Sequence, residues 1–294
     1  MKHLIKNILS DDMPAQPVIT LKLCDSEIID KLSLFYTHKD GNDEKDYEDA
    51  SGFNLDTLLF SISDGATESI FSKELANMLV ESFVSTEVVS EDGIKGMLAG
   101  AIEKVKTQWG LMVAGKSLPW YAQEKVEEGA HAAFLGFRIV PISVNNKKGI
   151  RRYLTSLPSR YVNVALKWEV AGVGDSCLFI VRGNRLIKSF PIETAAKFDN
   201  TPCLISSIGT MDNRDIFIDS GYLAAGDTIY MLSDAIAEWF LNYYEAGQMP
   251  WKMLESIVDN AGFQTFVDTL RESKKLKNDD TTLVTLCIGG KVKS

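Results

Sequence analysis

Aspartates close two segments of the chain that otherwise read as β-strands. Residues 57–63 lead into Asp64, and residues 228–232 lead through a serine into Asp234, so a sheet rather than a mobile loop would hold each carboxylate. Further acids stand beside other predicted strands or turns: Glu48, Asp49, Asp175, Asp279 and Asp280. A single acid at a strand end is more often a turn former or a helix cap than a ligand. If several converge, the carboxylates would repel one another, and Mg²⁺ or Mn²⁺ in an all-oxygen site would relieve that repulsion.

Histidine and cysteine chemistry fits the chain poorly. The three histidines form no His-Glu-x-x-His pattern, and His131 lies in an apolar run typical of a partly buried histidine with satisfied hydrogen bonds. The four cysteines are far apart and include no Cys-x-x-Cys pair, which indicates reduced thiols rather than a disulfide framework or a zinc ribbon. No cysteine is followed six residues later by an arginine, so the loop of a thiol phosphatase is absent from the sequence.

Residues 110–117 match the pattern Gly-x4-Gly-Lys-Ser of a phosphate-binding loop. That loop needs a β-strand before it and a helix whose N-terminus receives the phosphates. Here residues 94–109 read as a helix, and Pro119 follows the motif almost at once. We therefore expect a chance match, which ATP affinity before and after Lys116→Ala would test.

The composition is that of a soluble globular chain. Of its 294 residues 45% are hydrophobic and 24% charged, and a net charge of −9 argues against a general nucleic-acid binder. The N-terminal residues contain no sustained apolar core of a signal peptide. The longest apolar stretch, residues 132–144, is interrupted by Arg138 and Pro141 and falls short of the ~20 residues of a membrane span. We expect a cytoplasmic protein that binds neither nucleic acid nor membrane.

Hydrophobic periodicity predicts an α+β fold, in which strands joined by tight turns form antiparallel sheets and helices pack against them. The predicted strands are 18–23, 32–36, 57–63, 132–140, 162–173, 178–181, 185–190, 228–232 and 281–288. The predicted helices are 72–84, 94–109, 235–244, 251–260 and 265–273. Since no Pro/Gly/Ser-rich break divides the chain, we expect one domain over residues 1–294.

A basic insertion at about 143–163 is the least regular part of the sequence. It carries Lys147, Lys148, Arg151, Arg152 and Arg160. The simpler interpretation is a solvated hairpin loop, because charge runs usually face water. The alternative is a docking segment for an acidic or phosphorylated partner.

Five short motifs follow one another along the chain. They are Glu48-Asp49-Ala50; Phe60-Ser61-Ile62-Ser63-Asp64-Gly65; Val173-Gly174-Asp175-Ser176 with Arg182-Gly183-Asn184-Arg185-Leu186; Gly226-Asp227 with Leu232-Ser233-Asp234; and Asp279-Asp280-Thr281-Thr282-Leu283-Val284. This ordered set resembles the metal-dependent serine/threonine protein phosphatases of type 2C. Each motif is weak alone, but together they span nearly the whole chain and are quite specific.

The resemblance implies a four-layer α-β-β-α sandwich of two mainly antiparallel sheets flanked by helices. It also implies a centre for two Mn²⁺ or Mg²⁺ ions in a cleft at one end of the sandwich. Asp64 would bridge both ions, while Asp234 and Asp279 would complete the shell of one. Glu48 and the carbonyl of Gly65 would hold the other ion directly or through water.

Three further acids and the reaction follow from the same resemblance. Asp49 matches a supporting acid beside the centre, and Asp175 and Glu238 match the ligands of a third, weaker metal. In the implied reaction, water activated by the two metals attacks the phosphorus of a phosphoserine or phosphothreonine, without a covalent phosphoenzyme.

The sequence departs from the type 2C pattern in three places. After Asp-Gly it reads Ala-Thr-Glu-Ser instead of Met-Gly-Gly-His, so Ser69 replaces the histidine credited with protonating the leaving group. Ala235 replaces a glycine after the second Ser-Asp. The upstream arginine that grips substrate phosphate has no clear match; Lys39 or Lys45 could serve, although either is more typical of a solvated surface lysine.

These observations predict a Mn²⁺- or Mg²⁺-dependent phosphatase of phosphoserine and phosphothreonine in proteins. Its partners would be a phosphorylated protein and a cognate Ser/Thr kinase. The departures favour an alternative, a catalytically weak or silent module on the same fold that binds phosphoproteins and has a regulatory role.

Overall fold

The computed structural model describes residues 28–87, 93–143, 164–198, 202–210 and 213–289. The predicted strand at 18–23 and the five basic residues of the insertion lie outside these ranges. Within them, no helix is long and apolar enough to cross a membrane.

The strands form two sheets, and every pair described is antiparallel. The five-stranded sheet has the order β1 (Ile29–Thr37), β11 (Thr281–Ile288), β10 (Asp227–Leu232), β6 (Cys177–Arg182) and β7 (Arg185–Phe190). The other has the order β2 (Ala50–Asn54), β3 (Leu59–Gly65), β4 (His131–Ser143), β5 (Val164–Val173) and β9 (Phe217–Leu223), with β8 (Ile205–Ser206) paired to β4. The predicted antiparallel sheets are confirmed.

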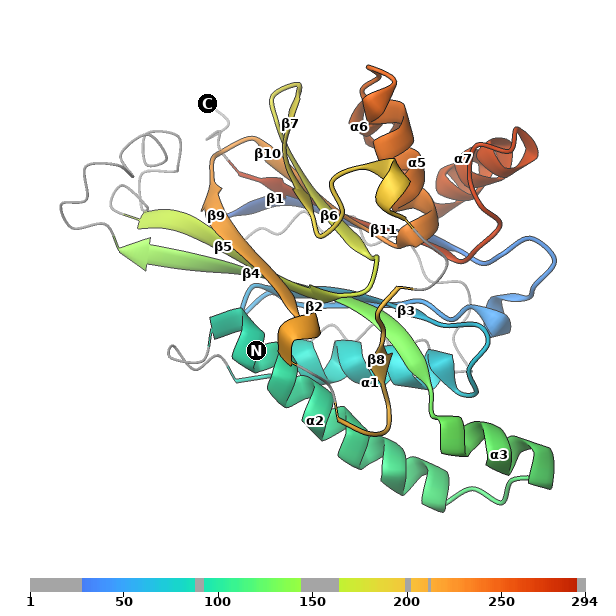
Figure 1. Ribbon diagram of the computed structural model, residues 1–294. Helices are drawn as coiled ribbons and strands as arrows, with labels where there is room; N and C mark the ends of the chain where they lie inside the picture. Colours follow the sequence, from blue (N-terminus) through green and yellow to red (C-terminus); the bar gives the residue numbers. More distant parts are fainter. Residues whose placement is uncertain (1–27, 88–92, 144–163, 199–201, 211–212, 290–294) are drawn as a thin grey trace.

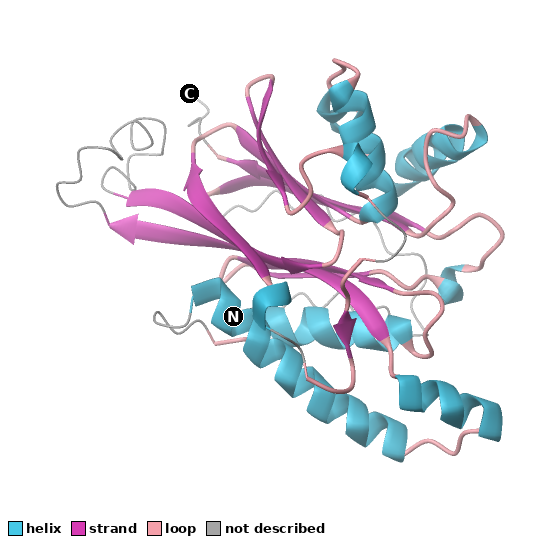
Figure 2. Ribbon diagram, in the orientation of Figure 1, coloured by secondary structure: helices cyan, strands magenta, loops and turns pink. Residues whose placement is uncertain are grey.

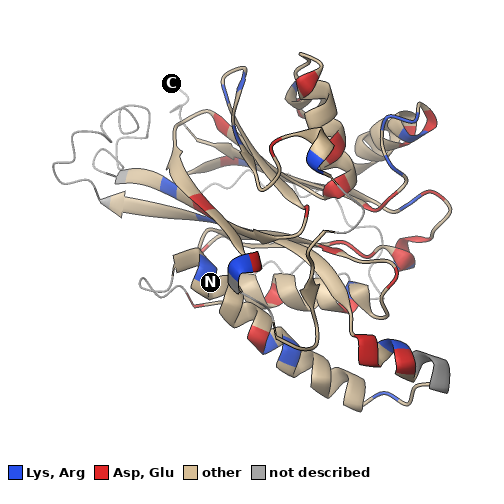
Figure 3. Ribbon diagram, in the orientation of Figure 1, with Lys and Arg blue, Asp and Glu red and all other residues tan. Residues whose placement is uncertain are grey.

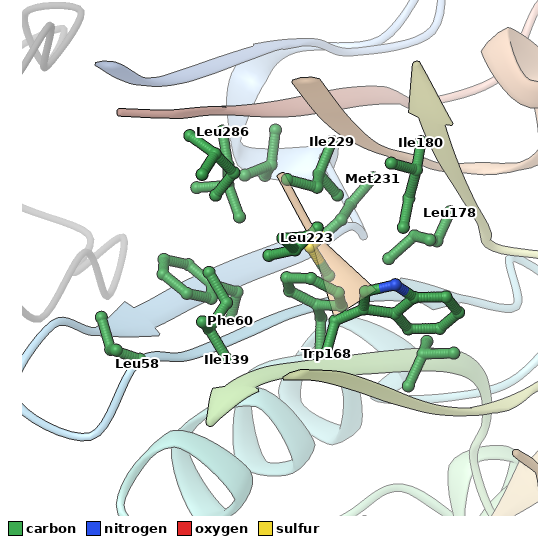
Figure 4. Close-up of a cluster of buried hydrophobic side chains, with 14 of the residues drawn as sticks. Leu58, Phe60, Ile139, Trp168, Leu178, Ile180, Leu223, Ile229, Met231 and Leu286 are labelled. Carbon is green, nitrogen blue, oxygen red and sulfur yellow. The ribbon is translucent and has the colours of Figure 1, made fainter. Parts of the chain in front are cut away.

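The two sheets face each other across an apolar core. Alternate side chains of each strand point to opposite faces, so Phe60 of β3 enters this core while its neighbour Leu59 packs against helices. Ile229 and Met231 of β10 meet the core from the opposite sheet (Figure 4). Because side chains on both faces of the central strands are buried, the two sheets form the inner layers of a sandwich.

Helices form the two outer layers (Figures 1 and 2). Helices α1 (Ser72–Val84) and α2 (Gly93–Ala114) cover the six-stranded sheet, and their apolar faces share a cluster with β3, β4 and β5. Helices α5 (Asp234–Glu245), α6 (Pro250–Glu255) and α7 (Asn260–Glu272) cover the five-stranded sheet. The predicted α-β-β-α sandwich is therefore confirmed.

Several element boundaries differ from the predicted ones. Helix α2 continues five residues past the predicted end at Trp109, because a single glycine at position 110 weakens a helix without ending it. The predicted helix 251–260 was wrong in length: α6 ends at Glu255, and Asp259 instead caps α7 by accepting a hydrogen bond from the Gly262 N–H. The sequence analysis also missed some elements: β2, β8, β9, the short α3 (Trp120–Glu128) and the single-turn 3₁₀ helices, among them η1 (Glu44–Asp46).

Candidate active site

Sheet register brings acids that are distant in sequence to one end of the sandwich. Strand β10 is antiparallel to both neighbours, so its last residue, Leu232, pairs with Leu283 near the start of β11 and with Cys177 at the start of β6. The segments after β10 and before β11 and β6 therefore meet, and the end of β3 joins them from the other sheet. A cavity of about 380 Å³ lies there, lined by four aspartates: Asp64, Asp175, Asp234 and Asp279.

Glycines keep the backbone close at two points of this site. A Cβ on Gly65 would come within 2.9 Å of the Ser72 carbonyl oxygen and 3.0 Å of the Glu48 carbonyl oxygen. Gly174 has a φ of +93°, and a Cβ there would approach the Cβ of Ala133 to 2.6 Å. Only glycine fits either position, so the Asp-Gly and Gly-Asp pairs set how the two aspartates enter the cavity.

The crowded acids resist ionisation. Burial, followed by the charge of Asp49, raises the pKa of Asp64 well above its ordinary value. Burial and then the neighbouring Asp279 raise the pKa of Asp234 to about 6, although Lys277 opposes that rise. The chain thus concentrates negative charge at one place at a cost to the ionised forms, which a bound cation would offset.

Two lysines reach the acid cluster, Lys39 from the loop after β1 and Lys277 from the loop before β11. Lys39 places its Nζ 2.8 Å from Oδ1 of Asp279 and 3.9 Å from Oε2 of Glu48, and its side chain is only 15% exposed. Lys277 places its Nζ 3.0 Å from Oε2 of Glu238 and 3.8 Å from Oδ2 of Asp234. Lys39 is therefore not the solvated surface lysine that its sequence context suggests, whereas Lys45 is exposed and pairs with Asp43.

Glu48 and Asp49 lie beside the cavity rather than on its wall. The Ser72 hydroxyl donates to Oε1 of Glu48, which lines a neighbouring cavity of about 360 Å³. Asp49 is 1% exposed and accepts a hydrogen bond from the Thr282 hydroxyl at 2.6 Å. Its second oxygen, Oδ1, has no partner among the described residues. Burial raises the pKa of Asp49 well above its ordinary value.

Two residues that position the site were given no role in the sequence analysis, although Asp280 was named there among the acids. The Asp280 carboxylate is buried and accepts hydrogen bonds from the backbone N–H groups of Lys39 at 2.8 Å and Glu48 at 2.6 Å. Arg271 of α7 donates to the carbonyl oxygens of His38 at 3.0 Å and Asp279 at 2.5 Å. Together they hold the loop after β1 against the loop before β11. Acidic segments of several elements lie at this end of the sandwich (Figure 3). The doubled aspartate was a signal for Asp280, but nothing in the sequence singled out Arg271.

The donor chemistry of the cavity fits a hard divalent cation. Its wall offers carboxylates and no histidine or cysteine, which favours Mg²⁺ or Mn²⁺ over zinc. As the side chains stand, no group of three or more His, Cys, Asp or Glu in the described ranges is arranged to hold a metal ion. A cation would therefore have to draw carboxylates such as Asp279 and Asp234 together, and Asp279 away from Lys39.

The departures noted in the sequence have clear structural settings. The Ser69 hydroxyl donates to the Ala66 carbonyl at 2.8 Å and accepts from the His131 backbone N–H at 3.1 Å, so it fixes a turn against β4. Ala235 lies in the first turn of α5, where right-handed backbone needs no glycine. Lys116 of the phosphate-loop pattern follows a helix rather than a strand and stacks over the Phe71 ring, 4.2 Å from its centroid, as expected of a chance match.

Comparison with known proteins identifies the fold. No family model matches the sequence, and no curated protein matches it. Among solved structures, Stp1, a serine/threonine phosphatase from Staphylococcus aureus, is similar over 88% of this chain and 95% of its own, with 14% identity and a TM-score of 0.55. The catalytic domain of the phosphatase PstP, solved with two manganese ions, matches over 87% and 98%, with 10% identity and a TM-score of 0.52.

A third similar structure is PppA, described as a key regulatory component of the T6SS in Pseudomonas aeruginosa. It covers 87% of this chain and 96% of its own, with 15% identity and a TM-score of 0.51. At such identities the similarity establishes architecture alone. The chain has the fold of the type 2C serine/threonine protein phosphatases.

Proposed function

We propose that this protein is a metal-dependent phosphatase that hydrolyses phosphoserine and phosphothreonine in proteins. One observation carries the proposal: four aspartates from separate elements line a single cavity on a fold shared with serine/threonine phosphatases. Their mutual repulsion calls for a cation there. The described cavity wall contains no cysteine that could form a covalent phosphoenzyme.

In this proposal the chain's own residues hold two Mn²⁺ or Mg²⁺ ions. Asp64, Asp234 and Asp279 would hold these ions together with Glu48 and the carbonyl of Gly65. Bound there, such ions lower the pKa of water and neutralise charge on phosphate oxygens. Since Ser69 supplies no proton near neutral pH and is engaged with the backbone, the leaving group would take its proton from water.

Lys39 is the residue we assign to the substrate phosphate. Its ammonium group is largely buried beside Asp279, and it also donates to the Thr67 hydroxyl at 2.5 Å, on the wall of the cavity. Released from Asp279 when that carboxylate turns to a metal, the ammonium would face a phosphate oxygen. A lysine acts there as a point charge, without the two-pronged grip of an arginine.

Hydrolysis of p-nitrophenyl phosphate with and without Mn²⁺ tests the proposal. We expect release of p-nitrophenol that requires Mn²⁺, stops on chelation and is lost in Asp64→Asn. The matched control is Asp56→Asn, a change of an exposed aspartate in the turn between β2 and β3. Activity that is absent with metal, or that survives both chelation and Asp64→Asn, would overturn the proposal.

A second candidate function is binding of phosphoproteins without hydrolysis. It is favoured by the two lysines, which already pair with acids of the cavity, and by Ser69 in place of a histidine. PppA provides a regulatory protein with a similar fold. Calorimetry with a phosphoserine peptide separates the two candidates, because binding with no release of phosphate in the presence of Mn²⁺ would support the regulatory role.

A further inference from the structure

Lys277 sits between two acids of helix α5. Asp234 and Glu238 are four residues apart, so both carboxylates project from one face of the helix. The Lys277 ammonium reaches both of them, at 3.8 Å and 3.0 Å, from the loop before β11. The same lysine lines the cavity together with Asp175.

That position is the one in which the type 2C resemblance implies a third metal. Asp175 and Glu238 are the acids matched to its ligands, and the ammonium group hydrogen-bonds one of them. A divalent ion binds carboxylate oxygens at about 2.0–2.1 Å for Mg²⁺, so it would need the oxygen lone pairs that Lys277 now engages. An ion and an ammonium group would also repel each other across so short a distance.

We propose that the Lys277 side chain is a built-in cation that takes the place of the third metal ion, so that Asp175 and Glu238 bind none. The chain then needs only the two ions of the proposed centre, and Lys277 supplies fixed positive charge beside Asp234. The contribution of this charge to a two-ion centre rests on the proposed function. The exclusion of a third cation by Lys277 does not.

Counting bound Mn²⁺ on the full chain tests the inference. The number of Mn²⁺ ions bound per chain is measured by calorimetry and by electron paramagnetic resonance of the free Mn²⁺. It is compared between the unaltered chain and Lys277→Met, which keeps the length of the side chain but removes its charge. We expect the variant to bind one Mn²⁺ more per chain. Adding Glu238→Gln to Lys277→Met should abolish that gain.

Two controls separate charge from general disturbance. Lys252→Met removes a lysine of α6 that pairs with Glu255 at 2.8 Å, and it should leave the count unchanged. Lys277→Arg keeps the positive charge and should also leave it unchanged, while Lys277→Gln replaces the methionine variant if that one does not fold.

An equal count in the unaltered chain and in the neutral variants would overturn the inference, as would an extra ion in Lys277→Arg. The proposed function fails on a different result, namely an unaltered chain that binds no Mn²⁺ sensitive to Asp64→Asn. The role of Lys277 is decided by the difference in bound Mn²⁺ between the unaltered chain and the neutral Lys277 variants, whether or not the chain is a phosphatase.

Discussion

The two ends of strand β10 treat an aspartate in opposite ways. At its start, Asp227 is fully buried, and both of its oxygens accept hydrogen bonds from Arg182 at 2.7 Å, with a third from the Ala224 N–H at 2.8 Å. Just past its end, Asp234 meets other acids at a cavity, and its pKa rises to about 6. The Asp227 carboxylate therefore has a hydrogen-bond partner at each oxygen, whereas the Asp234 carboxylate lies among other negatively charged groups. The contrast separates an acid that holds the fold from one suited to bind a ligand.

Asp64→Asn is expected to have the largest effect on this contrast. Removing the central carboxylate should lower Mn²⁺-dependent turnover of p-nitrophenyl phosphate on the order of 10³-fold, as for loss of one preorganised electrostatic group. Unfolding in urea should show equal or greater stability without metal, because one charge of a repelling cluster has gone. A variant that loses stability by several kcal/mol would make Asp64 a structural acid like Asp227.

Mn²⁺ should stabilise the folded chain by binding at the Asp234 end of β10, and not at the Asp227 end. Each ion that binds only the folded chain adds about 2.7 kcal/mol to its stability when the free concentration is a hundred times the Kd of that ion. We expect that shift in urea unfolding of the unaltered chain and of Asp227→Asn, and its loss in Asp64→Asn. An equal shift in all three would place the ion elsewhere.

Asp227→Asn should change stability rather than activity. Breaking a buried ion pair from one side costs roughly 3–5 kcal/mol, and we expect about 2 kcal/mol because the Arg182 side chain is 36% exposed. The folded fraction should keep its kcat in the phosphatase assay. A large fall in kcat at unchanged stability would erase the distinction between the two ends of β10.

Arg271→Lys should give the smallest effect. A lysine keeps the charge but cannot donate to the His38 and Asp279 carbonyls as a rigid fork, so Lys39 and Asp279 lose their common anchor. We expect kcat to fall about tenfold with little change in KM. Arg185→Lys, an exposed change on β7, is the matched control and should leave kcat unchanged.

Much of this architecture could be predicted from the sequence because its central strands are short, strongly apolar runs bounded by turn residues. Helix α1 and strand β11 have the predicted bounds, and Asp64 and Asp234, at the ends of β3 and β10, line the same cavity. Strand β9 was missed because it is an edge strand with exposed and polar residues, which leave no alternating apolar signal.

The contacts around the site were harder to foresee. Lys39 meets Asp279, and Asp280 meets the backbone of Lys39, across some 240 residues of sequence. Composition and periodicity describe single segments and do not predict which lysine forms an ion pair with which acid. In the sequence, Lys277 and Arg271 are not distinguishable from other charged residues near a helix end, because their partners are distant segments that only the fold places beside them.

The place of β11 in its sheet has a consequence for synthesis of the chain. This strand, the last one described, lies between β1, the first, and β10, and within the described residues it is the sheet neighbour of β1. On the ribosome, β1 can therefore pair with β11 only after residues 281–288 have emerged. Because the loop that carries Lys277 and Asp279 leads directly into the same strand, closure of the five-stranded sheet and assembly of the acid cluster both depend on this one segment.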